Sequence, residues 1–330
     1  MQPVIWYEFT TDEANLKRLE AHARVVCGGS VTELNNVFAV VIGSIIDANG
    51  KFMDSIGPSL RAIIRPGIGV DNVDLDAATQ RGIMVINTPD APTESTAEHA
   101  VALLMAVAKR VVTGSRFLQT NDFPRTELLG TEVRDRVLGV IGCGRIGRRV
   151  AEICGLGFKM KIVAYDPFLT NVELPGVEFT TDLDDLLSRA DFLTLHIPLT
   201  PQTYHLIGEE QIRRMKRGSY IINAARGPVV DEKALICALQ DGHLAGAGLD
   251  VFDPEPPAGD NPLLYMNNVV CTPHVASYTD RGQSGMRTGV VDQIIQLLQN
   301  QRPPFIVNAQ AWPGRMAKNL QARVFIKGKG

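Results

Sequence analysis

Three side chains suited to hydride-transfer chemistry each follow a short apolar segment in the second half of the chain. Arg226 ends the segment IINAAR, Glu255 follows GLDVFDP, and His274 ends VVCTPH. An arginine offers a planar pair of donors for a carboxylate, a histidine exchanges a proton near neutral pH, and a glutamate can orient the imidazole and favour its charged form. Together they predict a catalytic set that acts on an oxo acid beside a nicotinamide.

A glycine-rich segment, VLGVIGCGRIGRRV, predicts a strand that turns directly into a helix at a dinucleotide-binding site. Gly142 permits the tight turn, Gly144 lets the backbone approach a pyrophosphate, and Gly147 lets helix and strand pack closely. The pyrophosphate would lie at the N-terminus of the helix that begins near Arg145. Asp166 ends the next apolar segment, where a carboxylate binds the ribose hydroxyls. Because no arginine follows to receive a 2′-phosphate, the sequence favours NAD over NADP. The alternative is a glycine turn with a helix-capping aspartate.

His196 is the main alternative to His274 as the proton donor, because it also ends an apolar segment. His205 lies in a loop, and its role is open. The remaining histidines are expected to be surface or helix-packing residues: His22, His99 and His243. No pair of histidines at metal-ligand spacing and no Cys/His cluster occurs in the sequence, so no metal site is expected.

A second glycine-containing loop, RPGIGVDN, follows an apolar segment in the first hundred residues. Its consecutive N–H groups, around Gly67, Ile68 and Gly69, can turn inward as a nest for the carboxylate of a substrate. Arg65 is placed to meet an additional anion. The alternative is a plain strand-to-helix turn in which Asp71 or Asn72 caps the helix.

Apolar segments that alternate with helix-like segments predict an α/β protein with parallel sheets. In the middle and later part of the chain, strands are expected at 137–141, 161–165, 191–196, 219–223, 244–251 and 269–272. A smaller unit carries strands at 4–7, 38–42, 60–64 and 83–86, with helices near 12–22 and 71–81. Between the two units, one long helix is expected over 95–118, and another helix over about 284–299.

Composition narrows the class of protein. Lys and Arg number 33 and Asp and Glu 36, a net charge of −3, so nucleic-acid and membrane partners are not expected. The N-terminus shows no signal peptide. Five cysteines without a C-x-x-C pair indicate a reducing, cytoplasmic location. The basic tail from Met316 is expected to fray.

With these motifs, the sequence resembles the D-isomer-specific 2-hydroxyacid dehydrogenase family over roughly residues 36–305, and its phosphoglycerate dehydrogenase branch in particular. The likeness includes LLGTE, the glycine-rich segment, AYDP, NAARGPVVDE, LDVFDPEP and TPH. It implies two doubly wound parallel-sheet domains with the active site in the cleft. The smaller, flavodoxin-like substrate domain would comprise 1–102 and 296–330, and the NAD-binding Rossmann domain 103–295.

The resemblance also implies roles for residues in these motifs. Arg226 would bind the substrate with the loop at Arg65, Gly67, Ile68 and Gly69, while Glu255 supports His274 as the acid/base. Members usually form homodimers through the cofactor domain. The further residues implied to contact the cofactor, beside Arg226 and His274, are Arg145, Ile146, Ala224, Ala225, Asp250, Ala276 and Ser277.

The resemblance to the phosphoglycerate dehydrogenase branch implies 3-phosphoglycerate and 3-phosphohydroxypyruvate as substrates, and Arg65 is placed to meet their phosphate. Two departures from that branch bear on the substrate. VASYT follows His274 in place of a small Gly/Ala/Ser stretch, which puts the bulky Tyr278 near the substrate. A regulatory domain is also not expected. The alternatives are a hydroxypyruvate or glyoxylate reductase and, in another class, an NAD(H)-sensing, corepressor-like binding protein.

Overall fold

The computed structural model describes residues 2–120, 123, 125–169 and 174–312. The chain forms two compact units: unit 1 comprises Met1–Pro92 and Asp280–Gly330, and unit 2 comprises Thr93–Thr279. The boundaries expected after residues 102 and 295 instead fall inside helices α4 and α10, each of which stays whole within one unit because its hydrogen bonds run along it. The basic tail from Met316 lies outside the described residues.

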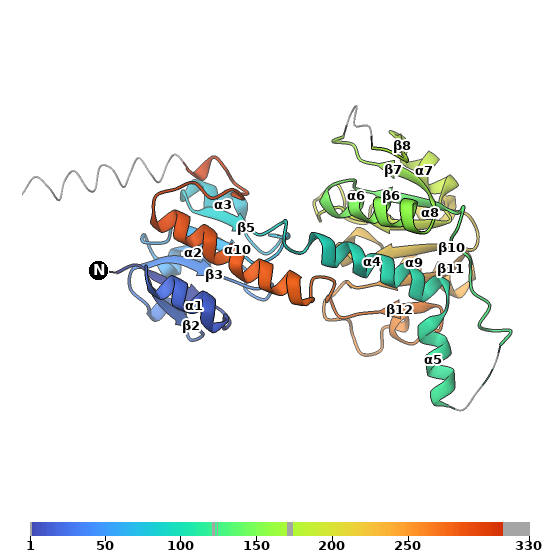
Figure 1. The fold of residues 1–330 in the computed structure, drawn as a ribbon, viewed down its shortest axis with the longest axis horizontal. Helices are drawn as coiled ribbons and strands as arrows, with labels where there is room; N and C mark the ends of the chain where they lie inside the picture. The colour runs from blue at the N-terminus through green and yellow to red at the C-terminus, as the bar shows by residue number, and fades with distance from the viewer. Residues whose placement is uncertain (1, 121–122, 124, 170–173, 313–330) are drawn as a thin grey trace, which may run out of the picture. The chain divides into compact units, whose positions relative to one another are not determined.

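Within the described residues, unit 1 is built on a five-stranded parallel sheet in the order β2-β1-β3-β4-β5 (Figure 1). Helices α1 and α10 bury their apolar side chains on one face of this sheet, and α2 and α3 cover the other. The strands are β1 (Val4–Tyr7), β2 (Arg24–Cys27), β3 (Val37–Val41), β4 (Ala62–Arg65) and β5 (Met84–Asn87). The helices are α1 (Glu13–Glu20), α2 (Gly50–Ile56), α3 (Leu75–Gln80) and α10 (Asp280–Leu298).

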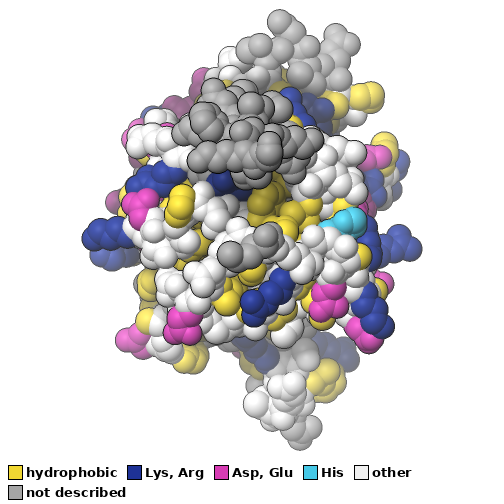
Figure 2. All heavy atoms as spheres, turned by 90° about the vertical axis from the view of Figure 1, so that its left-hand side faces the viewer, with side chains coloured by type: hydrophobic (Ala, Val, Ile, Leu, Met, Phe, Trp, Pro, Cys, Tyr) yellow, Lys and Arg dark blue, Asp and Glu magenta, His cyan; other side chains and the backbone are white. Residues whose placement is uncertain are grey.

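The face that lies on the left of Figure 1, where unit 1 is drawn, carries charges of both signs. Figure 2 shows basic and acidic side chains interspersed over it, with apolar side chains between them. This mixture follows from the nearly balanced counts of 33 basic and 36 acidic residues.

Unit 2 contains a seven-stranded parallel sheet, in the order β12-β11-β10-β9-β6-β7-β8, within the part of the chain that the structure describes. Helices α4 and α6 cover one face, and α7, α8 and α9 the other (Figure 1). The strands are β6 (Val137–Ile141), β7 (Lys161–Tyr165), β8 (Val177–Thr180), β9 (Phe192–Leu195), β10 (Ser219–Asn223), β11 (Leu244–Leu249) and β12 (Val269–Cys271). The helices are α4 (Thr93–Ala108), α5 (Val111–Gln119), α6 (Arg145–Glu152), α7 (Leu183–Arg189), α8 (Glu209–Arg214) and α9 (Glu232–Gln240). Both sheets have helices on both faces, so the prediction of two doubly wound parallel sheets is confirmed.

The prediction of one long helix over 95–118 is wrong, because the chain breaks between α4 and α5. Arg110 has a left-handed backbone with φ of 53°, and its guanidinium donates to the carbonyl of Glu127 at 3.0 Å. The amide of Thr131 donates to the carbonyl of Ala108 at 2.7 Å, and a Cβ on Gly130 would lie 2.7 Å from that same carbonyl oxygen. The segment after α5 therefore returns to donate a hydrogen bond to the carbonyl of Ala108, the last residue of α4, and the helix ends there.

None of the helices in the described residues combines the length and the apolar character needed to cross a membrane.

Candidate active site

The glycine-rich turn joins the carboxyl end of β6 to the start of α6. Gly142 has a φ of 85°, and a Cβ there would lie 2.5 Å from the carbonyl oxygen of His196. A Cβ on Gly147 would lie 2.0 Å from the carbonyl oxygen of Gly142, so any larger residue would force the helix off the strand. A Cβ on Gly144 would meet nothing within 4 Å. Two glycines are thus needed for packing, while the third leaves an open backbone at the N-terminus of α6, which Arg145 and Ile146 begin. This open backbone fits a pyrophosphate.

Asp166 lies beside this turn, at the end of β7. Its Oδ2 accepts from the amide of Cys143 at 2.9 Å and its Oδ1 accepts from the amide of Phe168 at 3.0 Å. The carboxylate is half-buried, so it remains open to a ligand on one side. A negative charge at this place fits the ribose of NAD and opposes a 2′-phosphate.

Arg226 follows β10 in a loop that a buried amide shapes. The side chain of Asn223 donates from Nδ2 to the carbonyl of Arg226 at 2.9 Å and accepts at Oδ1 from the amide of Ala225 at 3.0 Å. A Cβ on Gly227 would lie 1.9 Å from the carbonyl oxygen of Phe252, so only glycine lets the loop after β10 pack against the loop after β11. This packing brings the backbone of Arg226 close to the segment that carries Glu255.

His274 and Glu255 meet at the carboxyl ends of β12 and β11. Nδ1 of His274 lies 2.5 Å from Oε1 of Glu255, and the two side chains are 44% and 40% exposed. Burial alone would raise the pKa of Glu255, but the hydrogen bond and charge of His274, together with the charge of Arg226, hold that pKa below its usual value. Glu255 thus interacts electrostatically with both other predicted catalytic side chains. Nε2 of His274 is the ring nitrogen that does not face the glutamate.

Asp250 is fully buried and organises the loop on which His274 lies. Its Oδ1 accepts from the hydroxyl of Thr272 at 2.6 Å and from the amide of Val275 at 2.9 Å, and its Oδ2 accepts from the amide of Ala276 at 2.9 Å. The amide of His274 donates to the carbonyl of Asp250 at 2.8 Å. These bonds hold His274 in a left-handed backbone with φ of 51°, a conformation that few residues other than glycine adopt. Burial would raise the pKa of Asp250, but its hydrogen bonds outweigh this effect and lower the pKa.

His99, on α4, extends this network. Its Nε2 lies 2.9 Å from Oγ1 of Thr272 and 3.4 Å from Oδ1 of Asp250. The expectation that His99 packs a helix is therefore incomplete, because its ring also joins the loop that carries His274. No sequence motif relates α4 to this loop, so only the fold reveals the contact.

His196 has surroundings that differ from those of His274. Its Nε2 lies 2.9 Å from Oγ1 of Thr194, and burial lowers its pKa to about 4. At neutral pH this ring is uncharged and has no proton to spare for an acid role.

The glycine loop of unit 1 follows β4. The amide of Gly67 donates to Oγ1 of Thr88 at 2.8 Å, so that N–H is not available to the expected anion nest. The amides of Ile68 and Gly69 have no acceptor among the described residues. Arg65 donates to the carbonyl of Ile42 at 2.9 Å.

Neither Asp71 nor Asn72 caps α3. Asp74 does, because its side chain accepts from the amide of Ala77, and the helix begins at Leu75 rather than near residue 71. Asn72 instead donates to the carbonyls of Gly43 and Ile46.

Among the described residues, no group of three or more His, Cys, Asp or Glu side chains could hold a metal ion.

Comparison with known proteins identifies the family. The model of the D-isomer specific 2-hydroxyacid dehydrogenase NAD-binding domain matches residues 101–276, which span the glycine-rich turn, Asp166, Arg226, Glu255 and His274. The chain belongs to this family. Unit 2 is therefore the family's NAD-binding domain, and the predictions of the family and of NAD as its cofactor are confirmed.

The similar proteins in this family carry two different names. It is 44% identical over 251 residues to a D-3-phosphoglycerate dehydrogenase of Methanocaldococcus jannaschii, covering 76% of this chain and 48% of that protein. It is 46% identical over 260 residues to a glyoxylate reductase of Korarchaeum cryptofilum, covering 77% of each. The chain thus spans about half the length of the phosphoglycerate dehydrogenase. Both names are those of oxidoreductases, so the predicted enzyme class is that of the family.

Among solved structures, the TT0316 protein of Thermus thermophilus superposes with a TM-score of 0.85 at 36% identity, covering 92% of this chain and 99% of that chain. A glyoxylate reductase from Paecilomyes thermophila also gives a TM-score of 0.85, at 26% identity, covering 94% of this chain and 99% of that one. The family fold thus extends over both units.

Proposed function

We propose that this chain catalyses NAD-dependent hydride transfer at C2 of a D-2-hydroxy acid or its 2-oxo acid. The hydrogen bond between Nδ1 of His274 and Oε1 of Glu255 is the observation that carries the proposal. It pairs a histidine with a carboxylate next to an arginine, at the sheet edge that also bears the glycine-rich turn. Ligands bind at this edge in doubly wound folds.

The glycine-rich turn and Asp166 would hold NADH, which would supply the hydride for reduction at C2. Arg226 binds the carboxylate of the 2-oxo acid with its planar guanidinium and polarises the neighbouring carbonyl. His274 gives the proton on Nε2 to the carbonyl oxygen, because its Nδ1 faces Glu255. The negative charge of Glu255 stabilises the imidazolium before the transfer. In the direction of oxidation, neutral His274 takes the hydroxyl proton through the same nitrogen.

The substrate we favour is the pair 3-phosphoglycerate and 3-phosphohydroxypyruvate. Support comes from the name of the 44% identical relative and from Arg65, whose guanidinium lies beside a loop with two amides that have no acceptor among the described residues. A reductase of glyoxylate or hydroxypyruvate is the second candidate. The 46% identical relative of that name and Tyr278, which is 69% exposed four residues after His274, favour it.

A turnover assay separates these candidates. We expect kcat/KM with NADH to be highest for 3-phosphohydroxypyruvate among a panel that also contains hydroxypyruvate and glyoxylate, each run with NADPH in parallel. A preference for glyoxylate would exchange the order of the two candidates. NADH binding without turnover of any 2-oxo acid would indicate an NAD(H)-sensing binding protein.

A charge-removing variant tests the role of Arg65 in this choice. Arg65→Gln should lower kcat/KM for 3-phosphohydroxypyruvate about 10-fold or more and change that for glyoxylate much less, since a charge-assisted bond to phosphate is lost. Arg61→Gln is a matched control, because Arg61 precedes the other end of β4 and also donates to a backbone carbonyl, that of Pro58 at 2.6 Å. Equal losses for both substrates would remove Arg65 from the specificity site.

A homodimer formed through unit 2, in the cytoplasm, completes the proposal. Val111 and Leu118 of α5 are each 60% exposed and Leu129 is 84% exposed, so apolar side chains gather on and after this helix. Sedimentation of the purified chain should give twice the monomer mass, and Val111→Lys with Leu118→Lys should shift it toward the monomer.

A further inference from the structure

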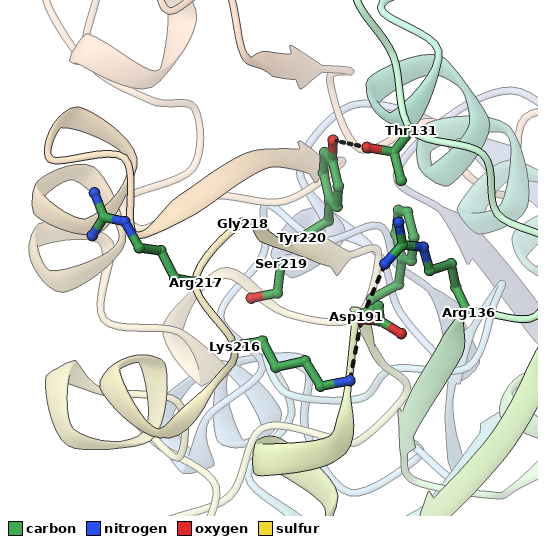
Figure 3. A pocket seen from close by; sticks show the side chains of 9 residues that line it. Thr131, Arg136, Asp191, Lys216, Arg217, Gly218, Ser219 and Tyr220 are labelled. Carbon is green, nitrogen blue, oxygen red and sulfur yellow. Dashed lines mark hydrogen bonds and ion pairs between the residues drawn. The ribbon is translucent and has the colours of Figure 1, made fainter.

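Unit 2 has a cavity at the edge of its sheet opposite to the glycine-rich turn. The cavity measures about 240 Å³ and lies where β9 and β10 begin and where Arg136 leads into β6 (Figure 3). Because the strands are parallel, this amino edge is separated from the catalytic edge by a strand of about five residues, or about 15 Å. None of the roles proposed above uses these residues.

Cationic side chains outnumber carboxylates around the cavity. Asp191 accepts at Oδ2 from the amide of Val137 at 2.8 Å, while its Oδ1 lies 3.1 Å from Nζ of Lys216 and 3.8 Å from Nη1 of Arg136. Arg217 also lines the cavity, and it donates to the carbonyl of Asp241 at 3.1 Å. Two cations thus contact one carboxylate and a third cation lines the cavity, which leaves two positive charges without a matching anion among the described lining residues.

A buried hydroxyl lies at the same place. Ser219 is 1% exposed, and its Oγ has no hydrogen-bond partner among the described residues. Figure 3 shows this oxygen directed toward the space between the side chains of Lys216 and Arg217. The hydroxyl of the next residue, Tyr220, is by contrast satisfied by Thr131 at 2.8 Å. A buried hydroxyl without a hydrogen-bond partner is unfavourable, so the oxygen of a ligand would stabilise it by accepting a hydrogen bond.

We propose that this cavity binds a phosphate dianion, either free phosphate or the phosphate group of a small monoester. A phosphate group carries a charge of about −1.5 to −2 at pH 7, which approaches the two excess positive charges. Its oxygens can accept from the guanidinium of Arg217, from Lys216 and from the hydroxyl of Ser219. A single carboxylate would leave one of the two charges unmatched.

Titration calorimetry on the full chain carrying Arg65→Gln tests the site, with saturating NAD present. NAD fills the cofactor's own phosphate site, and the substitution weakens the phosphate site proposed at Arg65. Inorganic phosphate and glycerol 3-phosphate are the probes, and acetate is the monoanionic comparison. We expect saturable binding of phosphate that Arg217→Gln weakens about 10-fold and Ser219→Ala about 3-fold. Tighter binding of glycerol 3-phosphate would identify a monoester ligand, and tighter binding of inorganic phosphate the free ion; both support the site.

Arg134→Gln is the matched control, since Arg134 lies two residues before Arg136, is 69% exposed and does not line the cavity. It removes the same charge from the same surface and should change phosphate affinity less than 2-fold. Absence of saturable binding, acetate binding as tight as phosphate, or equal weakening by Arg217→Gln and Arg134→Gln would each overturn the proposal. Arg217 is exposed, so its variant is expected to fold.

Discussion

The two edges of the seven-stranded sheet are made from the same strands but carry different kinds of charged groups. At the carboxyl edge, short hydrogen bonds fix the charged side chains. His274 and Glu255 lie 2.5 Å apart, and Asp250 accepts from Thr272 and Val275 at 2.6 and 2.9 Å. At the amino edge, Arg136 and Arg217 are exposed, with contacts of 3.8 Å to Asp191 and 3.1 Å to a backbone carbonyl. A fixed geometry favours catalysis, because reacting groups must be held in position, whereas exposed cations favour the binding of an anion. Substitutions should therefore affect turnover at one edge and anion affinity at the other.

Removal of the proton donor should have the largest effect. His274→Ala should lower kcat/KM about 10³-fold, because general acid catalysis contributes roughly 10²–10⁴-fold. His196→Ala serves as the control and should retain activity within a few-fold, since burial lowers the pKa of His196 to about 4. If the two variants lost activity equally, the assignment of the acid to His274 would fail.

Arg226→Lys should rank second. Lysine keeps the charge but loses the paired planar donors, so kcat/KM should fall about 10²-fold while the Kd of NADH stays nearly unchanged. Steady-state kinetics and fluorescence titration with NADH measure the two quantities. Activity within a few-fold of wild type would show that Arg226 does not bind the substrate carboxylate.

Asp250→Asn should test the rigidity of the carboxyl edge. The amide replaces one acceptor that buried N–H groups need, so the free energy of unfolding should fall by about 1–3 kcal/mol at pH 7. Because the folded state lowers the pKa of Asp250, its contribution is present above the unfolded value near 3.9 and is lost as the pH falls through the folded value. Denaturant unfolding at pH 7 and pH 3 should show the gap between the variant and wild type narrowing in acid; a constant gap would contradict this.

Glu255→Gln should lower the rate of reduction by a few-fold. The hydrogen bond and charge of His274 hold the pKa of Glu255 below its usual value, so the wild-type carboxylate is charged at pH 7. Loss of this charge removes a stabilising partner of the imidazolium, so kcat/KM for reduction at pH 7 should fall about 3- to 5-fold, as expected for a half-exposed ion pair. Equal kcat/KM for the variant and wild type would mean that the observed 2.5 Å contact has no influence on proton transfer.

Arg217→Gln should have the smallest effect on catalysis. In phosphate-free buffer its kcat/KM should lie within 2-fold of wild type, because the amino edge does not contact the reacting groups. A loss of 10-fold or more without any added anion would show that the two edges are not independent.

Strands that are buried along most of their length were predictable from the sequence, whereas two strands with exposed positions were not. The bounds of β6, β7 and β10 agree with the predicted segments, because strands that are buried on both faces form continuous apolar runs. β2 (Arg24–Cys27) and β8 (Val177–Thr180) were missed. Both are edge strands with exposed positions, so their apolar pattern is broken.

The candidate site shows the same division. That Glu255 lies close to His274 and Arg226 was predictable, because each of the three follows a recognisable strand and the strand ends of a parallel sheet share one edge. The contact between His99 and Thr272 joins residues 173 positions apart, and the hydrogen bonds that Asp250 accepts depend on a loop with a left-handed histidine. Such contacts arise from the packing of α4 and the loop, and local spacing carries no information about them.

Unit 1 is formed by two segments that are far apart in the sequence, and this has a consequence for its synthesis on the ribosome. Val290, Val291 and Ile294 of α10 cover the sheet face formed by side chains such as Ile5 and Ile64. The ribosome makes that sheet first and must then translate residues 93–279 before α10 emerges. At 5–20 residues per second, this interval lasts about 10–40 s. During that time the apolar face of the nascent sheet is covered by α1 without α10, so the newborn chain presents apolar surface to chaperones that the finished protein conceals.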